Sequence, residues 1–182
     1  MIIMINGAFG AGKTSVANEL LHRMDGAMLF DPEEVGFMLR HIIPDELKLE
    51  GEKTGDFQDL EMWKPLTVEV ARQLRETYSK DLIVPMTIYN KDYFDEIYNG
   101  FLKIDPESYH FCLTAKKETI HQRLIERGEE EGNWCFAQTD KCLAGFEDAC
   151  FEQFIPTDGV GIEEIADFIC KEIGQGENRI EL

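Results

Sequence analysis

Apolar residues recur along the chain in two patterns, as short continuous runs and as longer stretches at helical spacing. The continuous runs predict strands, at residues 2–5, 27–30, 82–87, 109–113 and 154–157. Stretches in which apolar residues return every three or four positions predict helices, at residues 12–24, 33–41, 57–78, 93–102, 118–127, 137–149 and 162–173. Strands separated by helices of this length predict a parallel sheet covered on both faces, and therefore a three-layer α/β fold.

Three features punctuate this pattern. Residues 47–55 are charged and flanked by glycines, which predicts a mobile loop ahead of the long predicted helix. Pro65 falls inside that helix, where it predicts a kink or a restart because proline lacks a backbone N–H. The segment at approximately residues 128–134 is polar, acidic and bounded by glycine, which predicts a lid. No repeat or linker-like stretch divides the chain, so we expect one domain over residues 1–182.

The composition, with 43% hydrophobic and 30% charged residues, is that of a globular protein of the aqueous phase. No segment approaches the ~20 apolar residues that span a bilayer, so no transmembrane segment is predicted. Residues 1–5 are apolar but lack a basic leader and a small-residue cleavage site and run directly into the glycine loop, which predicts a strand and not a signal peptide. The five cysteines contain no C-x-x-C pair, and we expect reduced thiols in a cytoplasmic protein.

The charge balance restricts the partners. Asp and Glu number 36 against 18 Lys and Arg, and the formal net charge of -18 disfavours nucleic acid or an anionic membrane as a partner. Any phosphate site must therefore be built locally. Nothing in the composition chooses between a monomer and a homodimer.

Residues 7–14 read Gly-Ala-Phe-Gly-Ala-Gly-Lys-Thr and match G-x-x-x-x-G-K-[ST], the phosphate-binding P-loop, between a predicted strand and a predicted helix. The glycines let backbone N–H groups turn toward a phosphate, and the positive end of the following helix favours that anion. Lys13 adds a charge between the β and γ phosphates, and Thr14 offers a hydroxyl to Mg²⁺. An ordinary glycine turn is the alternative interpretation.

The sequence lacks the motifs that define two other classes of P-loop protein. A GTPase needs Asn-Lys-x-Asp, but residues 90–93 place the Asp one position too early, and the D-x-x-G match at 158–161 lies near the C-terminus. A motor or transport ATPase needs an Asp directly after a buried strand, but the predicted strand at 82–87 ends in Thr87. We therefore expect neither class.

Asp31 directly follows the predicted strand at 27–30. The carboxyl end of a parallel strand faces the crevice where ligands bind. There a carboxylate can take the proton of an acceptor hydroxyl as the γ-phosphoryl group moves, and Glu33 can hold a Mg²⁺-bound water. The alternative for Asp31 is a simple N-cap of the next helix.

Phosphoryl transfer needs cations that stabilise the negative charge on the transferred group and on the leaving group. Arg123 and Arg127 lie four residues apart on one predicted helix, directly before the predicted lid. Alternatively, Arg123 pairs with a neighbouring acid on the surface, one of Glu126, Glu129 and Glu130.

The acceptor side has further candidates. Arg40 ends the predicted helix after Asp31 and can clamp the acceptor. The aromatic residues Phe37, Phe57 and Trp63 suit the wall of a pocket for a planar or glycosidic molecule, and packing between helices is the alternative for each.

Short segments distributed almost from end to end carry a second signal. They are residues 3–14, Asp31-Pro32-Glu33 with Gly36-Phe37, Asp56-Phe57-Gln58, Leu82-Ile83-Val84-Pro85-Met86-Thr87-Ile88, Lys117-Glu118-Thr119 with Arg123-Leu124, Trp134, Asp140-Lys141-Cys142 and Thr157-Asp158. Together they resemble the tunicamycin resistance protein family, and the Val-Pro-Met-Thr strand is more specific than the P-loop. Pro65 and the run Glu129-Glu130-Glu131 depart from that family.

The resemblance implies a branch of the small P-loop kinases, near nucleoside, shikimate and chloramphenicol phosphotransferases. It implies ATP and Mg²⁺ as cofactors and a five-stranded parallel sheet, the P-loop nucleoside triphosphate hydrolase fold. The residues expected to bind the nucleotide are Gly7, Gly10, Ala11, Gly12, Lys13, Thr14, Ser15, Arg123, Thr157 and Asp158. By position, Asp31 is the acceptor-side acid with Thr87 beside it, Arg127 is a lid arginine, and the turn at 157–159 lies against the adenine.

These inferences lead to one main hypothesis and two alternatives. The main hypothesis is an ATP-dependent phosphotransferase acting on a hydroxyl of a small nucleoside-like or glycosidic molecule, with tunicamycin a candidate. Asp31 is then the base, Lys13 and Arg127 stabilise charge, and Thr14 binds Mg²⁺. The alternatives are a protein that sequesters the antibiotic without modifying it and a regulatory NTPase with a protein partner.

Overall fold

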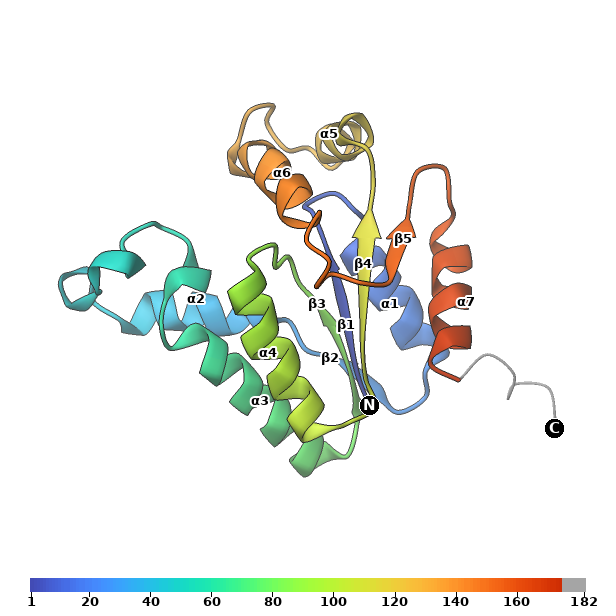
Figure 1. The fold of residues 1–182 in the computed structure, drawn as a ribbon, viewed down its shortest axis with the longest axis horizontal. Coiled ribbons are helices and arrows are strands. Elements are labelled where there is room, and N and C mark those ends of the chain that lie inside the picture. Colours follow the sequence, from blue (N-terminus) through green and yellow to red (C-terminus); the bar gives the residue numbers. More distant parts are fainter. Residues whose placement is uncertain (175–182) are drawn as a thin grey trace.

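The computed structural model describes residues 1–174, and in it five strands form one parallel sheet (Figure 1). The strands are β1 (Ile2–Gly7), β2 (Ala27–Leu29), β3 (Asp81–Pro85), β4 (Ser108–Thr114) and β5 (Phe154–Pro156). Their order across the sheet is β2-β3-β1-β4-β5, and each neighbouring pair is parallel. The predicted α/β fold with a five-stranded parallel sheet is thus confirmed.

Helices cover both faces of this sheet. They are α1 (Lys13–Arg23), α2 (Pro32–Ile42), α3 (Trp63–Tyr78), α4 (Lys91–Ile104), α5 (Lys117–Glu126), α6 (Trp134–Gly145) and α7 (Ile162–Glu172). Helices α1 and α7 lie on one side of the sheet, α2, α3 and α4 lie on the other, and α5 and α6 lie beyond the arrowhead of β4 (Figure 1). The carboxyl ends of the parallel strands therefore lie at the edge of the sheet where α5 and α6 are found (Figure 1).

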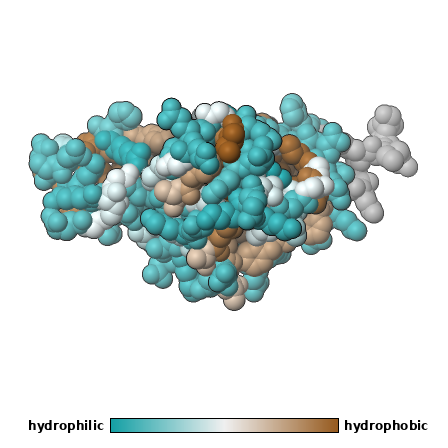
Figure 2. All heavy atoms as spheres, turned by 90° about the horizontal axis from the view of Figure 1, so that it is seen from above, coloured by the Kyte–Doolittle hydropathy of each residue, from teal (hydrophilic) through white to brown (hydrophobic). Residues whose placement is uncertain are grey.

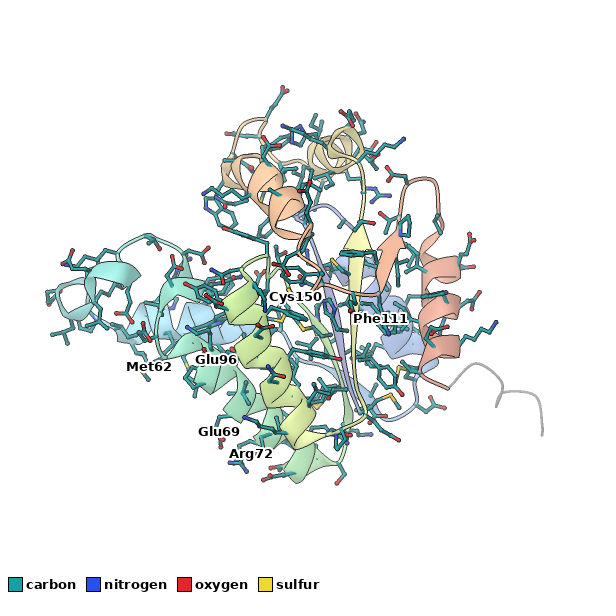
Figure 3. All side chains as sticks on the ribbon, viewed as in Figure 1. Met62, Glu69, Arg72, Glu96, Phe111 and Cys150 are labelled. Atoms are coloured by element: carbon teal, nitrogen blue, oxygen red, sulfur yellow. The ribbon has the colours of Figure 1, made fainter. Side chains whose placement is uncertain are left out.

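Residues 2–5 of strand β1 are continuously apolar because both faces of the strand are buried. Ile3 and Ile5 pack in the layer of α1 and α7, where Phe111 of β4 also lies (Figure 3). Ile2 and Met4 point to the opposite layer. Side chains alternate between the faces of a strand, so a strand between two helical layers needs apolar residues at every position.

The outer surface of the helices is charged. Glu69 and Arg72 on α3 and Glu96 on α4 project away from the sheet (Figure 3). Seen from above, the surface is mainly hydrophilic with apolar groups scattered over it (Figure 2). Among residues 1–174, no helix combines the length and the apolar composition that crossing a bilayer requires.

The prediction of one helix over residues 57–78 is wrong for residues 57–62. A short 3₁₀ turn at Phe57–Asp59 comes first, and α3 begins at Trp63. Pro65 therefore lies in the first turn of α3, where no intrahelical bond needs its N–H, and the helix runs without interruption from Trp63 to Tyr78.

Capping residues account for two further differences from the predicted elements. Helix α6 starts at Trp134 and not at residue 137, because the side chain of Asn133 accepts the N–H groups of Cys135 and Phe136. The predicted loop at 47–55 contains a 3₁₀ turn, Glu50–Glu52, and the buried carboxylate of Glu52 accepts the N–H groups of Leu49 and Glu61. A charged sequence thus folds locally around its own carboxylate.

Candidate active site

The phosphate-binding loop begins where β1 ends and α1 starts. Gly7 has φ +148°, and a Cβ there would lie 2.6 Å from the carbonyl oxygen of Leu113, so glycine is required for β1 to lie against β4. Gly12 has φ +102° in open space, and no side chain caps the α1 N-terminus that follows it. The first N–H groups of a helix lack intrahelical partners, so this uncapped end fits the phosphates of a nucleotide.

Lys13 is held over this loop. Its Nζ donates a 2.9 Å hydrogen bond to the carbonyl oxygen of Ala8 and lies 5.4 Å from the ring centroid of Phe9. Burial of the ammonium group lowers the pKa of Lys13 to about 8, and the nearby carboxylate of Glu33 partly offsets this. The ammonium form of Lys13 therefore has too little negative charge near it. A bound phosphate would supply that charge.

A cavity of about 860 Å³ extends from the loop. The predicted site residues that line it are Gly10, Ala11, Gly12, Lys13, Thr14, Ser15, Asp31, Glu33, Arg123, Arg127 and Thr157. Segments more than a hundred positions apart in the sequence thus meet at the carboxyl ends of the strands, as expected for a parallel α/β sheet.

Two carboxylates, those of Asp31 and Glu33, line the cavity. Asp31 accepts the N–H of Glu33 at 2.9 Å and caps α2, so the alternative interpretation of Asp31 as an N-cap is confirmed. The same residue nevertheless lines the cavity. Burial, reinforced by the charge of Asp31, raises the pKa of Glu33, while Lys13 opposes the shift. Glu33 therefore lies within the electrostatic reach of the P-loop lysine.

Arg123 and Arg127 also line the cavity but have different partners. Arg123 donates to the hydroxyl of Thr157 at 2.9 Å and to its carbonyl oxygen at 2.7 Å. The alternative pairing of Arg123 with a nearby glutamate is therefore wrong. Arg127 does form such a pair, because its Nη2 lies 2.8 Å from Oε1 of Glu129. One arginine is fixed to the loop after β5, and the other is held by a carboxylate.

Trp63 lies in the core and not on a pocket wall. Its side chain is 1% exposed, and its Nε1 donates a 3.0 Å hydrogen bond to the carbonyl oxygen of Pro32. A ring of this size is buried for its apolar area once its N–H finds a partner. Trp63 therefore supports the residue after Asp31 from behind.

The other predicted acceptor residues form a cluster outside the cavity. Phe57 packs edge-to-face against Phe37 and Trp63, with ring centroids 5.7 and 5.5 Å apart. Arg40 lies 5.2 Å from the Phe57 ring centroid and donates to the carbonyl oxygen of Gly55. Arg40 thus fastens the segment before residue 56 to α2, and the structure does not bring it to the cavity.

Three further predicted residues also have structural contacts in place of cavity positions. Asp158 accepts the N–H of Lys116 at 3.1 Å and the hydroxyl of Thr119, so it fixes the start of α5. Thr87 is buried, and its carbonyl oxygen accepts Nε2 of Gln58 at 2.8 Å. Gly7 serves the contact between β1 and β4 described above.

Two aromatic residues of the cavity were not expected to meet there. Phe9 of the loop and Trp134 at the start of α6 meet edge-to-face, with ring centroids 5.0 Å apart. The other lining residues without a predicted role are Val16, Pro85, Glu126, Cys135, Val160, Ile162 and Ile165. No spacing rule separates such residues from core positions, because their place follows from contacts between distant segments.

Comparison with known proteins agrees with this arrangement. A family model described as an AAA domain matches residues 3–141, which contain the P-loop, Asp31 and both arginines. The tunicamycin resistance protein of Deinococcus radiodurans is 30% identical, with 95% of each chain covered and a TM-score of 0.77. The chain belongs to the tunicamycin resistance protein family.

More distant structures show the same fold. Shikimate kinase from Acinetobacter baumannii, solved in complex with shikimate, is 14% identical, with 98% of this chain and 95% of that chain covered and a TM-score of 0.65. A sugar kinase from Janibacter sp. HTCC2649 is 17% identical, with 96% and 95% covered and a TM-score of 0.63. This member of the tunicamycin resistance protein family therefore has a P-loop kinase-like fold. No match was found among curated protein sequences.

Proposed function

We propose that the protein transfers the γ-phosphoryl group of ATP to a hydroxyl of a small nucleoside-like or glycosidic molecule. The observation that carries this proposal is the shared cavity, which is lined by the P-loop, two carboxylates and two arginines. A kinase needs these three elements together, because it must hold phosphates, accept a proton and balance charge. The kinase-like fold of the family supports the same reaction class.

The residues of the loop have distinct parts in this proposal. Backbone N–H groups of Gly10 to Ser15 hold the phosphates, and Lys13 with Arg123 and Arg127 offsets their charge. Thr14 would hold Mg²⁺, and Glu33 would hold it through a water. Among the described residues no group of three or more His, Cys, Asp or Glu could form a metal cage, which fits Mg²⁺ held mainly by the nucleotide. ATP would supply the phosphoryl group, and Mg²⁺ held at this site would offset the negative charge of the phosphates.

Asp31 accepts the proton from the acceptor hydroxyl as that oxygen bonds to the γ-phosphorus and the bond to ADP breaks. Its side chain is fixed by the hydrogen bond from the N–H of Glu33, so its position does not depend on the substrate. The backbone on which it sits is held from behind by Trp63. A base that is held in place in this way needs little rearrangement between substrate binding and reaction.

Tunicamycin is the first acceptor to test, because the relative from Deinococcus radiodurans is a tunicamycin resistance protein. The drug is incubated with the protein and MgATP, and mass spectrometry follows the drug while ADP is measured in parallel. A drug that gains one phosphate with equimolar ADP supports the proposal. A drug that is bound but unmodified, with ADP at background, indicates sequestration and refutes phosphotransfer to this acceptor.

A further inference from the structure

The carboxylate of Glu129 bridges two elements at the rim of the cavity. Its Oε1 lies 2.8 Å from Nη2 of Arg127, the C-cap of α5. Its Oε2 accepts the side-chain N–H of Asn133, which caps α6. One side chain thus joins a cavity arginine to the cap of the next helix.

The contact between Glu129 and Asn133 also affects a residue that lines the cavity. Oδ1 of Asn133 accepts the N–H of Cys135 at 3.0 Å and that of Phe136 at 3.4 Å, which fixes the first turn of α6. Trp134 lies in the same turn and touches Phe9 of the phosphate-binding loop. Arg127 and Trp134 both line the cavity, so the contacts of Glu129 set the positions of one cationic and one aromatic wall.

We propose that Glu129 is an internal competitor of the nucleotide phosphates for Arg127, and that its displacement releases the segment at 128–134. A phosphate group offers more acceptor oxygens and more negative charge than one carboxylate, so Arg127 gains by exchanging partners when a nucleotide binds. Glu129 then loses its cationic partner, and its hold on Asn133 weakens. The inference rests on the proposed function only in its nucleotide-binding part.

The exposure of the two side chains bounds the size of the effect. The side chains of Arg127 and Glu129 are 54% and 29% exposed, so water screens their attraction. An ion pair at such a position weakens a competing ligand by about two- to fivefold. A contact of this strength is weak enough for a nucleotide to break and strong enough to measure.

The first test compares Glu129→Gln with Glu131→Gln by titration calorimetry with MgATP and no acceptor. Glutamine keeps an oxygen acceptor for Asn133 but removes the charge that holds Arg127. We expect Glu129→Gln to bind ATP about two- to fivefold more tightly than the wild type. Glu131→Gln removes the same charge from an exposed neighbour and separates the contact from the general effect of net charge.

The second test repeats Glu129→Gln in an Arg127→Met background. If Glu129 acts through Arg127, the gain in ATP affinity disappears there. Tryptophan emission gives a readout of the segment, because Trp134 is 52% exposed while Trp63 is buried. ATP should change the emission of the wild type, ATP-free Glu129→Gln should already show part of that change, and Trp134→Phe should abolish it.

Unchanged ATP affinity in Glu129→Gln, an equal gain in Glu131→Gln, or a gain that persists without Arg127 each overturns the inference. ATP binding that is absent from the wild type and from Glu129→Gln alike overturns it together with the proposed function. Failure to phosphorylate any acceptor while the Glu129→Gln effect on ATP binding persists overturns only the proposed function.

Discussion

The side-chain amide of Asn6 pairs with both backbone groups of Ile88. Its Nδ2 donates to the carbonyl oxygen of Ile88 at 2.8 Å, and its Oδ1 accepts the N–H of Ile88 at 2.9 Å. The same Oδ1 accepts the N–H of Gly7 at 2.8 Å. Pro85 ends β3 just before this point, so a side chain of β1 replaces backbone pairing and ties the segment after β3 to the start of the phosphate-binding loop.

We predict that Asn6→Ala lowers the free energy of unfolding by about 2–4 kcal/mol. Asn6 is 0% exposed, and its removal leaves several buried backbone groups without partners, each at a cost of about 1–3 kcal/mol. Asn90→Ala is the control, because it removes an exposed helix cap and should cost only about 1 kcal/mol. Urea denaturation measures both, and an equal loss for the two variants would show that the Asn6 pairing carries no special weight.

The ATP affinity should depend on the protonation of Lys13. The pKa of Lys13 is lowered to about 8 in the free protein, and a bound phosphate raises it by stabilising the ammonium form. Affinity is therefore full below pH 8 and declines as the pH rises above 8, by up to about tenfold per unit, because binding then requires proton uptake. Titration calorimetry from pH 6.5 to 9.5, values chosen to bracket that pKa, should show this decline.

Lys13→Arg is the control for that profile, because arginine stays charged over this range. Whatever its absolute affinity, this variant should show no decline near pH 8. A wild-type affinity that stays flat up to pH 9.5, or an identical decline in Lys13→Arg, would contradict the assignment to Lys13.

Asp31→Asn should separate catalysis from folding. Asparagine caps a helix about as well as aspartate, so the melting temperature should stay within about 2 °C of the wild type. The amide cannot accept the hydroxyl proton, and turnover should fall by about 10²–10⁴-fold while ATP binding persists. A variant that retains most of its turnover would exclude Asp31 as the base and leave Glu33 to be tested as Glu33→Gln.

Alanine at two glycines of the loop should have different main consequences, a loss of stability at Gly7 and a loss of ATP affinity at Gly12. Gly7→Ala places a Cβ 2.6 Å from a backbone oxygen of β4, so it should lower the free energy of unfolding by about 2–4 kcal/mol. At Gly12 the added Cβ meets nothing within 4 Å, and only the strain of its positive φ remains, about 1–2 kcal/mol. Gly12→Ala should instead lose ATP affinity. Paired denaturation and calorimetry would contradict this if Gly12→Ala were the less stable variant.

Strands were predictable where the burial of both faces produces a continuous apolar run in the sequence. The strand core at residues 2–5 is apolar at every position because each residue faces a helical layer, and that run is visible in the sequence. Helix ends were less predictable, because single side chains decide them. Asn133 starts α6 three residues before the apolar pattern does, and the break before Trp63 interrupts a pattern that looks continuous.

The candidate site divides in the same way. The P-loop is a local motif, because its chemistry depends on backbone N–H groups and on one lysine at a fixed spacing from the glycines. The place of Asp31 in the cavity was predictable because Asp31 directly follows the apolar run at 27–30. The different roles of Arg123 and Arg127 were not, because Arg123 is fixed by Thr157, 34 positions away.

By itself, the sequence determined the alternation of strands and helices, the P-loop and the acid after β2, because each follows from neighbours along the chain. Only the tertiary structure decided that Trp63 belongs to the core, that Arg40 holds a loop and that Phe9 meets Trp134. The physical reason is that these side chains fit either a core or a pocket. The packing of distant segments chooses between them, and no local pattern encodes it.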